Sequence, residues 1–163
     1  MMRVGVFSDS HGDTQALDEL LERMGHVDAV CFLGDVESDA QHLRERLSAM
    51  PGERQFYAVR GNNDYFNRFQ LPWELLIELD GVRIYMTHGH RIVSDMSLVY
   101  KAQELDARVA MFGHTHAAYC AVEHGILVLN PGSAGNYCRG GRARASVLEI
   151  NHGKMKVTNV ALG

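Results

Sequence analysis

Two similar stretches near the start of the chain decide the fold: VGVFSDSHG at residues 4–12 and AVCFLGDV at residues 29–36. Each begins as a short apolar run, typical of a buried strand, and leads directly to an aspartate. Between them, Asp13 is a candidate helix N-cap, and apolar residues recur at helical spacing until Gly25 ends the pattern. This strand–helix–strand order predicts two parallel strands joined by a right-handed crossover.

The rest of the chain extends this pattern and then changes it. Ser38 and Gln41 match a capping box for a second helix, and residues 55–59 form a third apolar run. In the second half, Asp80-Gly81 suits a type I′ hairpin turn. We expect the remaining elements to be strands at 75–79, 82–86, 109–112, 117–122, 126–129, 145–150 and 154–160, with a helix at about 95–105. The predicted fold is α/β: one domain spanning residues 1–163, with two mixed β-sheets flanked by helices in a four-layer sandwich.

Composition excludes several classes of function. The chain is 46% apolar and 22% charged, which is typical of a globular protein, and its net charge of −4 indicates no basic surface for nucleic acid. Its three cysteines form no Cys-x-x-Cys pair, which suggests a reducing compartment. Neither a signal peptide nor a membrane-spanning stretch is recognisable, so we expect a cytoplasmic protein with no membrane partner.

Side chains that can bind metal ions follow five of the apolar runs. Seven of them are candidate ligands: Asp9, His11, Asp35, Asn62, His88, His114 and His116. In an extended segment, Asp9-x-His11 and His114-x-His116 would each place two donors on one side. Mixed carboxylate, amide and imidazole ligands suit Mn²⁺, Fe²⁺ or Zn²⁺ better than Ca²⁺. Each motif alone is more often a turn or a packed histidine, whereas their conjunction predicts a metal site that faces an open cleft.

The order of these motifs resembles a known family. Asp-x-His, Gly-Asp, Gly-Asn-x-Asp, His-Gly-His and Gly-His-x-His occur in the order found in the calcineurin-like metallophosphoesterase superfamily. The short length and the segment Asn130-Pro-Gly-Ser133 resemble its small YfcE-like phosphodiesterase branch. The resemblance spans about residues 3–160 and implies a four-layer αββα fold with a dinuclear metal centre. It implies that one ion takes Asp9, His11, Asp35 and His116, and that the other takes Asp35, Asn62, His88 and His114.

The resemblance also implies an activity. Two divalent ions would bind a small phosphodiester, and a hydroxide bridging them would attack phosphorus. Manganese is the first expectation, with iron, zinc, nickel and magnesium as the other candidates. With Asp9, Asp35 and the hydroxide counted, the centre keeps a charge of about +1, which attracts the substrate anion.

Four further residues are candidates for contact with substrate. Many family members carry a histidine where this chain has Asn63, which can donate a hydrogen bond but supplies no proton. We therefore expect diesters with acidic leaving groups to be better substrates than alkyl monoesters. His90 either orients the substrate or a ligand, or is a polar residue at a strand end. Ser133 and Arg139 either bind phosphate, or belong to a turn and a solvated basic loop.

Two other functions remain open at this stage. One is a non-catalytic protein-interaction scaffold of the same fold, and the other is a phosphomonoesterase. The four candidate histidine ligands argue against the first, and Asn63 argues against the second. The physiological substrate, the native metal, the role of Asp64 beside Asn63 and a possible homo-oligomer are not readable from the sequence.

Overall fold

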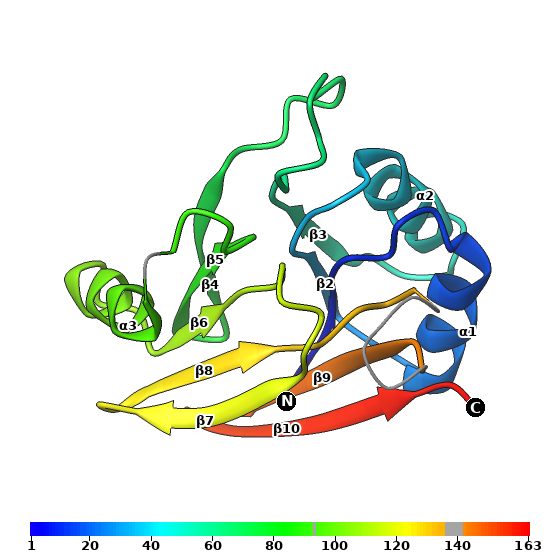
Figure 1. The fold of residues 1–163 in the computed structure, drawn as a ribbon. Helices are drawn as coiled ribbons and strands as arrows, with labels where there is room; N and C mark the ends of the chain where they lie inside the picture. The colour runs from blue at the N-terminus through cyan, green and yellow to red at the C-terminus, as the bar shows by residue number, and fades with distance from the viewer. Residues whose placement is uncertain (93, 136–141) are drawn as a thin grey trace.

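The computed structural model describes residues 1–92, 94–135 and 142–163 and contains three helices and ten strands among them (Figure 1). The first half holds β1 (Met2–Phe7), α1 (Thr14–Met24), β2 (Ala29–Phe32), α2 (Glu37–Ser48) and β3 (Gln55–Ala58). The second half holds β4 (Glu74–Leu79), β5 (Val82–Thr87), α3 (Asp95–Glu104), β6 (Val109–Met111), β7 (Tyr119–Glu123), β8 (Ile126–Asn130), β9 (Arg144–Asn151) and β10 (Lys154–Ala161). No helix in the described ranges is long and apolar enough to cross a membrane.

The strands form two mixed sheets of five strands each, in the orders β10-β9-β1-β2-β3 and β4-β5-β6-β8-β7. In the first sheet β1, β2 and β3 are parallel, with Val4 opposite Ala29 and Ala29 opposite Gln55. In the second sheet β5, β6 and β8 are parallel. The parallel βαβαβ order predicted for the first half is therefore confirmed.

Three apolar clusters separate four layers of secondary structure. Alternate residues of a strand face opposite sides of its sheet. In β1, Val4 and Val6 therefore pack between the two sheets, whereas Phe7 packs under α1 and α2. In the second sheet, Ile84 of β5 faces the inter-sheet core and Tyr85 packs against α3. The helices lie on the two outer sides (Figure 1), which confirms the four-layer αββα sandwich.

Local signals for turns and helix starts were mostly informative. Asp13 caps α1 by accepting a hydrogen bond from the Ala16 amide, as predicted. Asp80 and Gly81 both have positive φ, as a type I′ turn requires.

The capping box predicted for the second helix is wrong. The helix α2 begins at Glu37, and its N-cap is Val36, whose side chain makes no capping hydrogen bond. The Glu37 amide instead donates to the Asp64 carboxylate at 2.8 Å. The carboxylate of the distant Asp64 therefore takes the place of the local cap that was predicted from Ser38 and Gln41.

The inter-sheet core should dominate stability. Leu148 of β9 is 0% exposed in this core, whereas Val122 of β7 is 71% exposed. We expect Leu148→Ala to lower the free energy of unfolding by about 2–5 kcal/mol, because it removes packed methyl groups and leaves a cavity. The matched control Val122→Thr should change it by about 0.5 kcal/mol or less. Chemical denaturation followed by circular dichroism measures both, and equal effects would contradict this assignment of the core.

Candidate metal centre

The seven candidate ligands follow the ends of parallel strands from both sheets. Asp9 and His11 follow β1, Asp35 follows β2 and Asn62 follows β3; His88 follows β5, and His114 and His116 follow β6. The carboxyl ends of parallel strands share one edge of a sheet, and ligands collect at such edges. In this fold the two edges meet, so side chains that are up to 107 positions apart in the chain come together.

One group of donors surrounds Asp9. The Oδ1 atom of Asp9 lies 3.3 Å from Nε2 of His116 and 3.9 Å from Nε2 of His11. The two histidine Nε2 atoms are 3.1 Å apart. That separation is close to the distance of about 3 Å expected between neighbouring ligands that bind one ion at right angles with bonds of about 2.1 Å. One nitrogen or carboxylate atom from each of these three residues can therefore bind the same ion.

A second group of donors surrounds His88. Its Nε2 atom lies 3.5 Å from Oδ2 of Asp35 and 2.9 Å from Oδ1 of Asn62. The same Asn62 oxygen lies 3.1 Å from Nδ1 of His114. The Oδ2 atom of Asp35 is also 3.9 Å from Nε2 of His11, so this carboxylate lies between the two groups.

The burial of these groups fits a cation. Asp9 and His88 are 0% exposed and Asp35 is 2% exposed. Oδ2 of Asp9 accepts hydrogen bonds from the Ser8 hydroxyl and the His114 amide, whereas the buried Oδ1 has no hydrogen-bond partner among the described residues. An ionised oxygen buried without a partner is costly, and the donor set around it is the type that divalent transition metals bind.

Asp35 and His88 shift each other's pKa in opposite directions. Burial raises the pKa of Asp35, but the hydrogen bond and charge of His88 and two hydrogen bonds from Asn63 outweigh it and hold that pKa well below its usual range. Burial lowers the pKa of His88, but Asp35 and the charge of Asp9 outweigh it and raise that pKa above its usual value. Nδ1 of His88 donates to the Leu33 carbonyl at 2.7 Å, which directs Nε2 toward the carboxylates.

The extended backbone predicted for Asp9-x-His11 and His114-x-His116 is wrong. Asp9 and His11 have φ of 53° and 49°, and His114 and His116 have φ of 68° and 60°. The segments are therefore left-handed turns rather than extended chain, and alternation along a strand is not what brings each pair together. Asp35, with φ of 64°, shares this conformation. Residues other than glycine rarely adopt it, and they do so mainly where the surrounding structure enforces it.

Two glycines allow the loops to approach one another closely. A Cβ on Gly61 would overlap Oδ1 of Asp35 and lie 2.5 Å from its backbone nitrogen. A Cβ on Gly113 would overlap the Ser8 hydroxyl and lie 2.7 Å from Oδ2 of Asp9. Both glycines directly precede a candidate ligand, Asn62 and His114 respectively, so their missing side chains make room for the buried carboxylates.

Buried polar side chains away from the centre hold the ligand loops in place. Asp39 of α2 accepts from the Ser10 hydroxyl at 2.6 Å and from the Gly12 amide at 2.8 Å. Asp64 accepts from the amides of Gly61 and Glu37 and thereby joins the loops after β2 and β3.

Asn130 at the end of β8 joins two further loops in the same way. Its amide group donates to the Gly113 carbonyl at 3.1 Å and to the Thr115 hydroxyl at 3.0 Å, and its carbonyl accepts from the Gly132 amide at 2.9 Å. Asp39 was not predicted from the sequence, and Asp64 and Asn130 were not predicted to have such a positioning role. The available signal was that each is a polar residue beside a ligand motif or at a strand end.

Three of the four residues predicted to contact substrate lie in the described part of the chain, and they differ in exposure and in their distance from the candidate ligands. The exposed Asn63 donates two hydrogen bonds to Asp35: its backbone N–H to Oδ1 at 3.0 Å and its side-chain amide N–H to Oδ2 at 2.9 Å. The ring of His90 lies 5.6 Å from that of His88. Ser133 is fully buried, and its hydroxyl donates to the Asp9 carbonyl at 2.7 Å, which is a positioning contact. Arg139 lies outside the described residues.

Comparison with known proteins decides the family. Residues 2–153 match the calcineurin-like phosphoesterase superfamily domain. The chain belongs to this superfamily. It is 35% identical over 136 residues to the probable metallophosphoesterase YsnB of Bacillus subtilis, covering 81% of this chain and 75% of that protein. It is 27% identical to a phosphodiesterase of Methanocaldococcus jannaschii, covering 85% and 88% of the two chains.

Solved structures agree with this assignment. A predicted phosphoesterase from Streptococcus pneumoniae superposes with a TM-score of 0.78 and 32% identity, covering 98% of this chain and 88% of that chain. Vps29 of Chaetomium thermophilum has a TM-score of 0.75 at 20% identity, covering 99% and 97%, and shares the fold. The resemblance predicted from the five motifs is confirmed, and the chain is a metal-dependent phosphoesterase.

Close approach at Gly61 gives a test of the centre. We expect Gly61→Ala to reduce the affinity for divalent metal by roughly tenfold or more, because the new methyl group displaces Asp35. Gly125→Asn is the control, since that position is open and asparagine tolerates its positive φ. Metal content after dialysis measures the effect, with circular dichroism confirming folding. Full metal content in folded Gly61→Ala protein would contradict the geometry.

Proposed function

We propose that this chain is a phosphodiesterase that hydrolyses small phosphodiesters and uses two divalent metal ions, with manganese as the first candidate. The observation that carries the proposal is the pair of donor groups on either side of Asp35. Asp9, His11 and His116 would hold one ion, and Asn62, His88 and His114 the other, with Asp35 between them. The phosphodiesterase of Methanocaldococcus jannaschii supports a diester as the substrate.

The reaction adds water across a phosphorus–oxygen bond. The water oxygen bonds to phosphorus, the bond to the leaving oxygen breaks, and the products are an alcohol and a phosphate monoester. When bound, a pair of divalent ions polarises water and binds the non-bridging phosphate oxygens. The strand ends and the buried hydrogen bonds described above hold the donors in place before the substrate arrives, which reduces the reorganisation that catalysis requires.

The residues beside the ligands have separate roles in this proposal. Asn63 supports Asp35 through two hydrogen bonds and supplies no proton to the leaving oxygen. Burial, with the charges of His88 and Arg91, lowers the pKa of His90, so its ring is neutral near pH 7 and orients the substrate by hydrogen bonding. Ser133 holds the backbone of Asp9 in place through its hydrogen bond to the Asp9 carbonyl. Arg139 stays a candidate for binding phosphate.

A non-catalytic interaction scaffold is the second candidate. Tyr65 and Phe66, three and four residues after Asn62, are 76% and 82% exposed, and large exposed aromatic side chains favour protein contacts. A scaffold, however, needs neither the buried carboxylates nor the converging histidines. A phosphomonoesterase would use the same donors, and its substrate carries one ester substituent on phosphorus where a diester carries two.

Substitution of Asp35 separates catalysis from a scaffold role. We expect Asp35→Asn to reduce diester turnover by more than about a hundredfold and to lower metal content, because one shared anionic ligand is lost. His152→Asn, at an exposed turn, should leave both unchanged. Release of p-nitrophenolate from bis(p-nitrophenyl) phosphate, assayed with Mn²⁺ and other divalent ions, measures turnover. Undiminished activity in Asp35→Asn would reject the proposed centre.

Asn63 predicts a dependence on the leaving group. Without a proton donor at this position, the leaving oxygen departs as an anion, so its acidity should govern the rate. We expect kcat/KM to fall by about tenfold or more from p-nitrophenyl ethyl phosphate to phenyl ethyl phosphate, and alkyl monoesters to be poor substrates. Steady-state kinetics on this series is the measurement. Efficient hydrolysis of alkyl monoesters would favour the phosphomonoesterase instead.

A further inference from the structure

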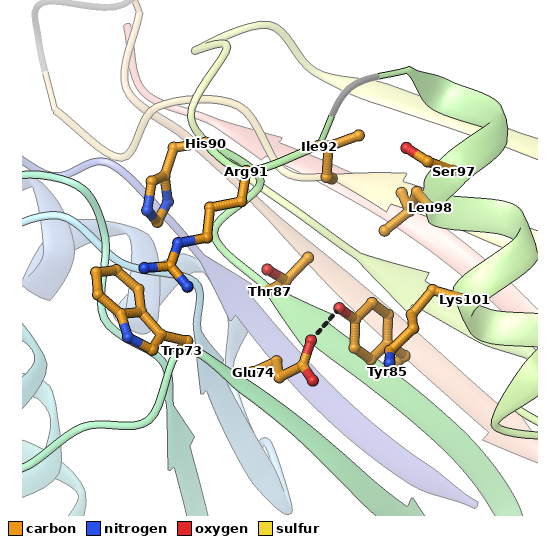
Figure 2. A pocket seen from close by; sticks show the side chains of 10 residues that line it. All are labelled: Trp73, Glu74, Tyr85, Thr87, His90, Arg91, Ile92, Ser97, Leu98 and Lys101. Carbon is orange, nitrogen blue, oxygen red and sulfur yellow. Dashed lines mark hydrogen bonds between the residues drawn. The ribbon is translucent and has the colours of Figure 1, made fainter.

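A pocket of about 560 Å³ lies between the loop that follows β5 and the helix α3. Figure 2 shows Trp73 and Arg91 on one side, Lys101 of α3 on the opposite side, and Thr87 between them on the sheet. We call it the Trp73 pocket. Its volume falls within the range of about 300–1,000 Å³ that is usual for small-molecule sites.

The Trp73 pocket adjoins the candidate metal centre. His90 lines the pocket, and its ring centroid is 5.6 Å from that of His88 and 6.3 Å from that of His114. Thr87, which also lines the pocket, directly precedes His88. A ligand with its phosphorus beside these histidines can therefore extend a substituent past His90 into the pocket.

The charges in the pocket favour an anion. The side chains of Arg91 and Lys101 make no hydrogen bond or ion pair with another residue in the described part of the chain, so both cations are available to a ligand. The guanidinium carbon of Arg91 lies 4.0 Å from the centroid of the Trp73 ring, which restrains this cation at the pocket wall. Glu74 is the one carboxylate that lines the pocket, and it accepts a hydrogen bond from the Tyr85 hydroxyl at 2.6 Å (Figure 2).

The remaining lining is largely apolar. Ile92 and Leu98 contribute aliphatic surface, and Trp73 and Tyr85 contribute rings. Burial and the neighbouring Glu74 raise the pKa of Tyr85, so its hydroxyl stays neutral and adds no negative charge. An apolar body that carries an anionic group matches both properties of this pocket.

We propose that the Trp73 pocket binds an anionic group, a phosphate or a carboxylate, on the part of the substrate that is not displaced. This inference rests on the proposed phosphodiesterase activity and narrows its substrate class to small diesters with a second anionic group. Arg91 and Lys101 bind the second anion, and Trp73 and Leu98 contact the body that joins it to the reacting phosphate.

Binding can be measured without turnover because Trp73 is the only tryptophan of the chain. Two product-like probes, phenyl phosphate and 3-carboxyphenyl phosphate, differ by one carboxylate. We expect the carboxylated probe to bind the Mn²⁺-loaded protein about tenfold more tightly and to change the Trp73 fluorescence. Isothermal titration calorimetry gives the two dissociation constants independently of the fluorescence.

Two variants test which groups recognise the carboxylate. Lys101→Met and Arg91→Met remove one charge each and retain most of the side-chain volume, and each should bring the affinity ratio of the two probes toward one. Lys154→Met, at an exposed position of β10, is the matched control and should keep the ratio. A general loss of affinity at the metal centre weakens both probes equally, so it does not change the ratio of their affinities.

The outcomes separate this inference from the function on which it rests. A ratio within about twofold of one in the unmodified protein, or a ratio that both variants keep, overturns the pocket assignment. Hydrolysis of p-nitrophenyl phenyl phosphate is assayed in parallel. If no divalent ion supports turnover while the ratio still depends on Lys101 and Arg91, the phosphodiesterase proposal fails and the anion site stands.

Discussion

The burial of two carboxylates where the sheets meet is the constraint on which the site depends. Asp9 and Asp35 are almost completely removed from water, and an ionised carboxylate in such a place is costly unless positive charge or hydrogen-bond donors face it. The fold brings three histidines from the strand ends of the second sheet, His88, His114 and His116, to the same place, where His11 of the β1 loop joins them. The carboxylates and imidazoles together form a set of donors whose charge is best balanced by cations.

This arrangement requires a strained backbone, and the surrounding structure compensates for the strain. Five of the seven candidate ligands have left-handed φ, which costs on the order of 1 kcal/mol or more for each residue. Hydrogen bonds between the loops and buried side chains offset this cost. Asp39 and Asp64 accept such bonds from the loops, and Asn130 and Ser133 donate them. Each of these bonds links segments that are distant in sequence or fixes a turn beside a ligand. The loops are therefore held by contacts within the protein that involve neither an ion nor a substrate.

Periodicity was enough to predict the layers, because strands and helices follow from the spacing of apolar residues. The parallel first half, the Asp13 cap and the Asp80-Gly81 turn depend on neighbouring residues and were predicted correctly. The start of α2 depends on Asp64, 27 positions from Glu37, so a local capping rule failed. For the same reason the buried role of Ser133, whose partner is 124 positions away, could not be read from its turn motif. Composition and spacing revealed which donors exist, but not the turns that orient them.

The cost of the buried charges also bears on whether the chain is an enzyme or a scaffold. A buried ionic cluster contributes little to stability, and apolar residues of similar volume at the same positions often stabilise a protein more. The fully buried Asp9, whose Oδ1 accepts no hydrogen bond from a described residue, is therefore difficult to explain in a protein that only docks other proteins. At a metal-dependent active site the same atom would supply a charged ligand that does not need to lose bound water during the reaction. The energetic cost of burying these charges therefore favours an enzyme over a protein-interaction scaffold.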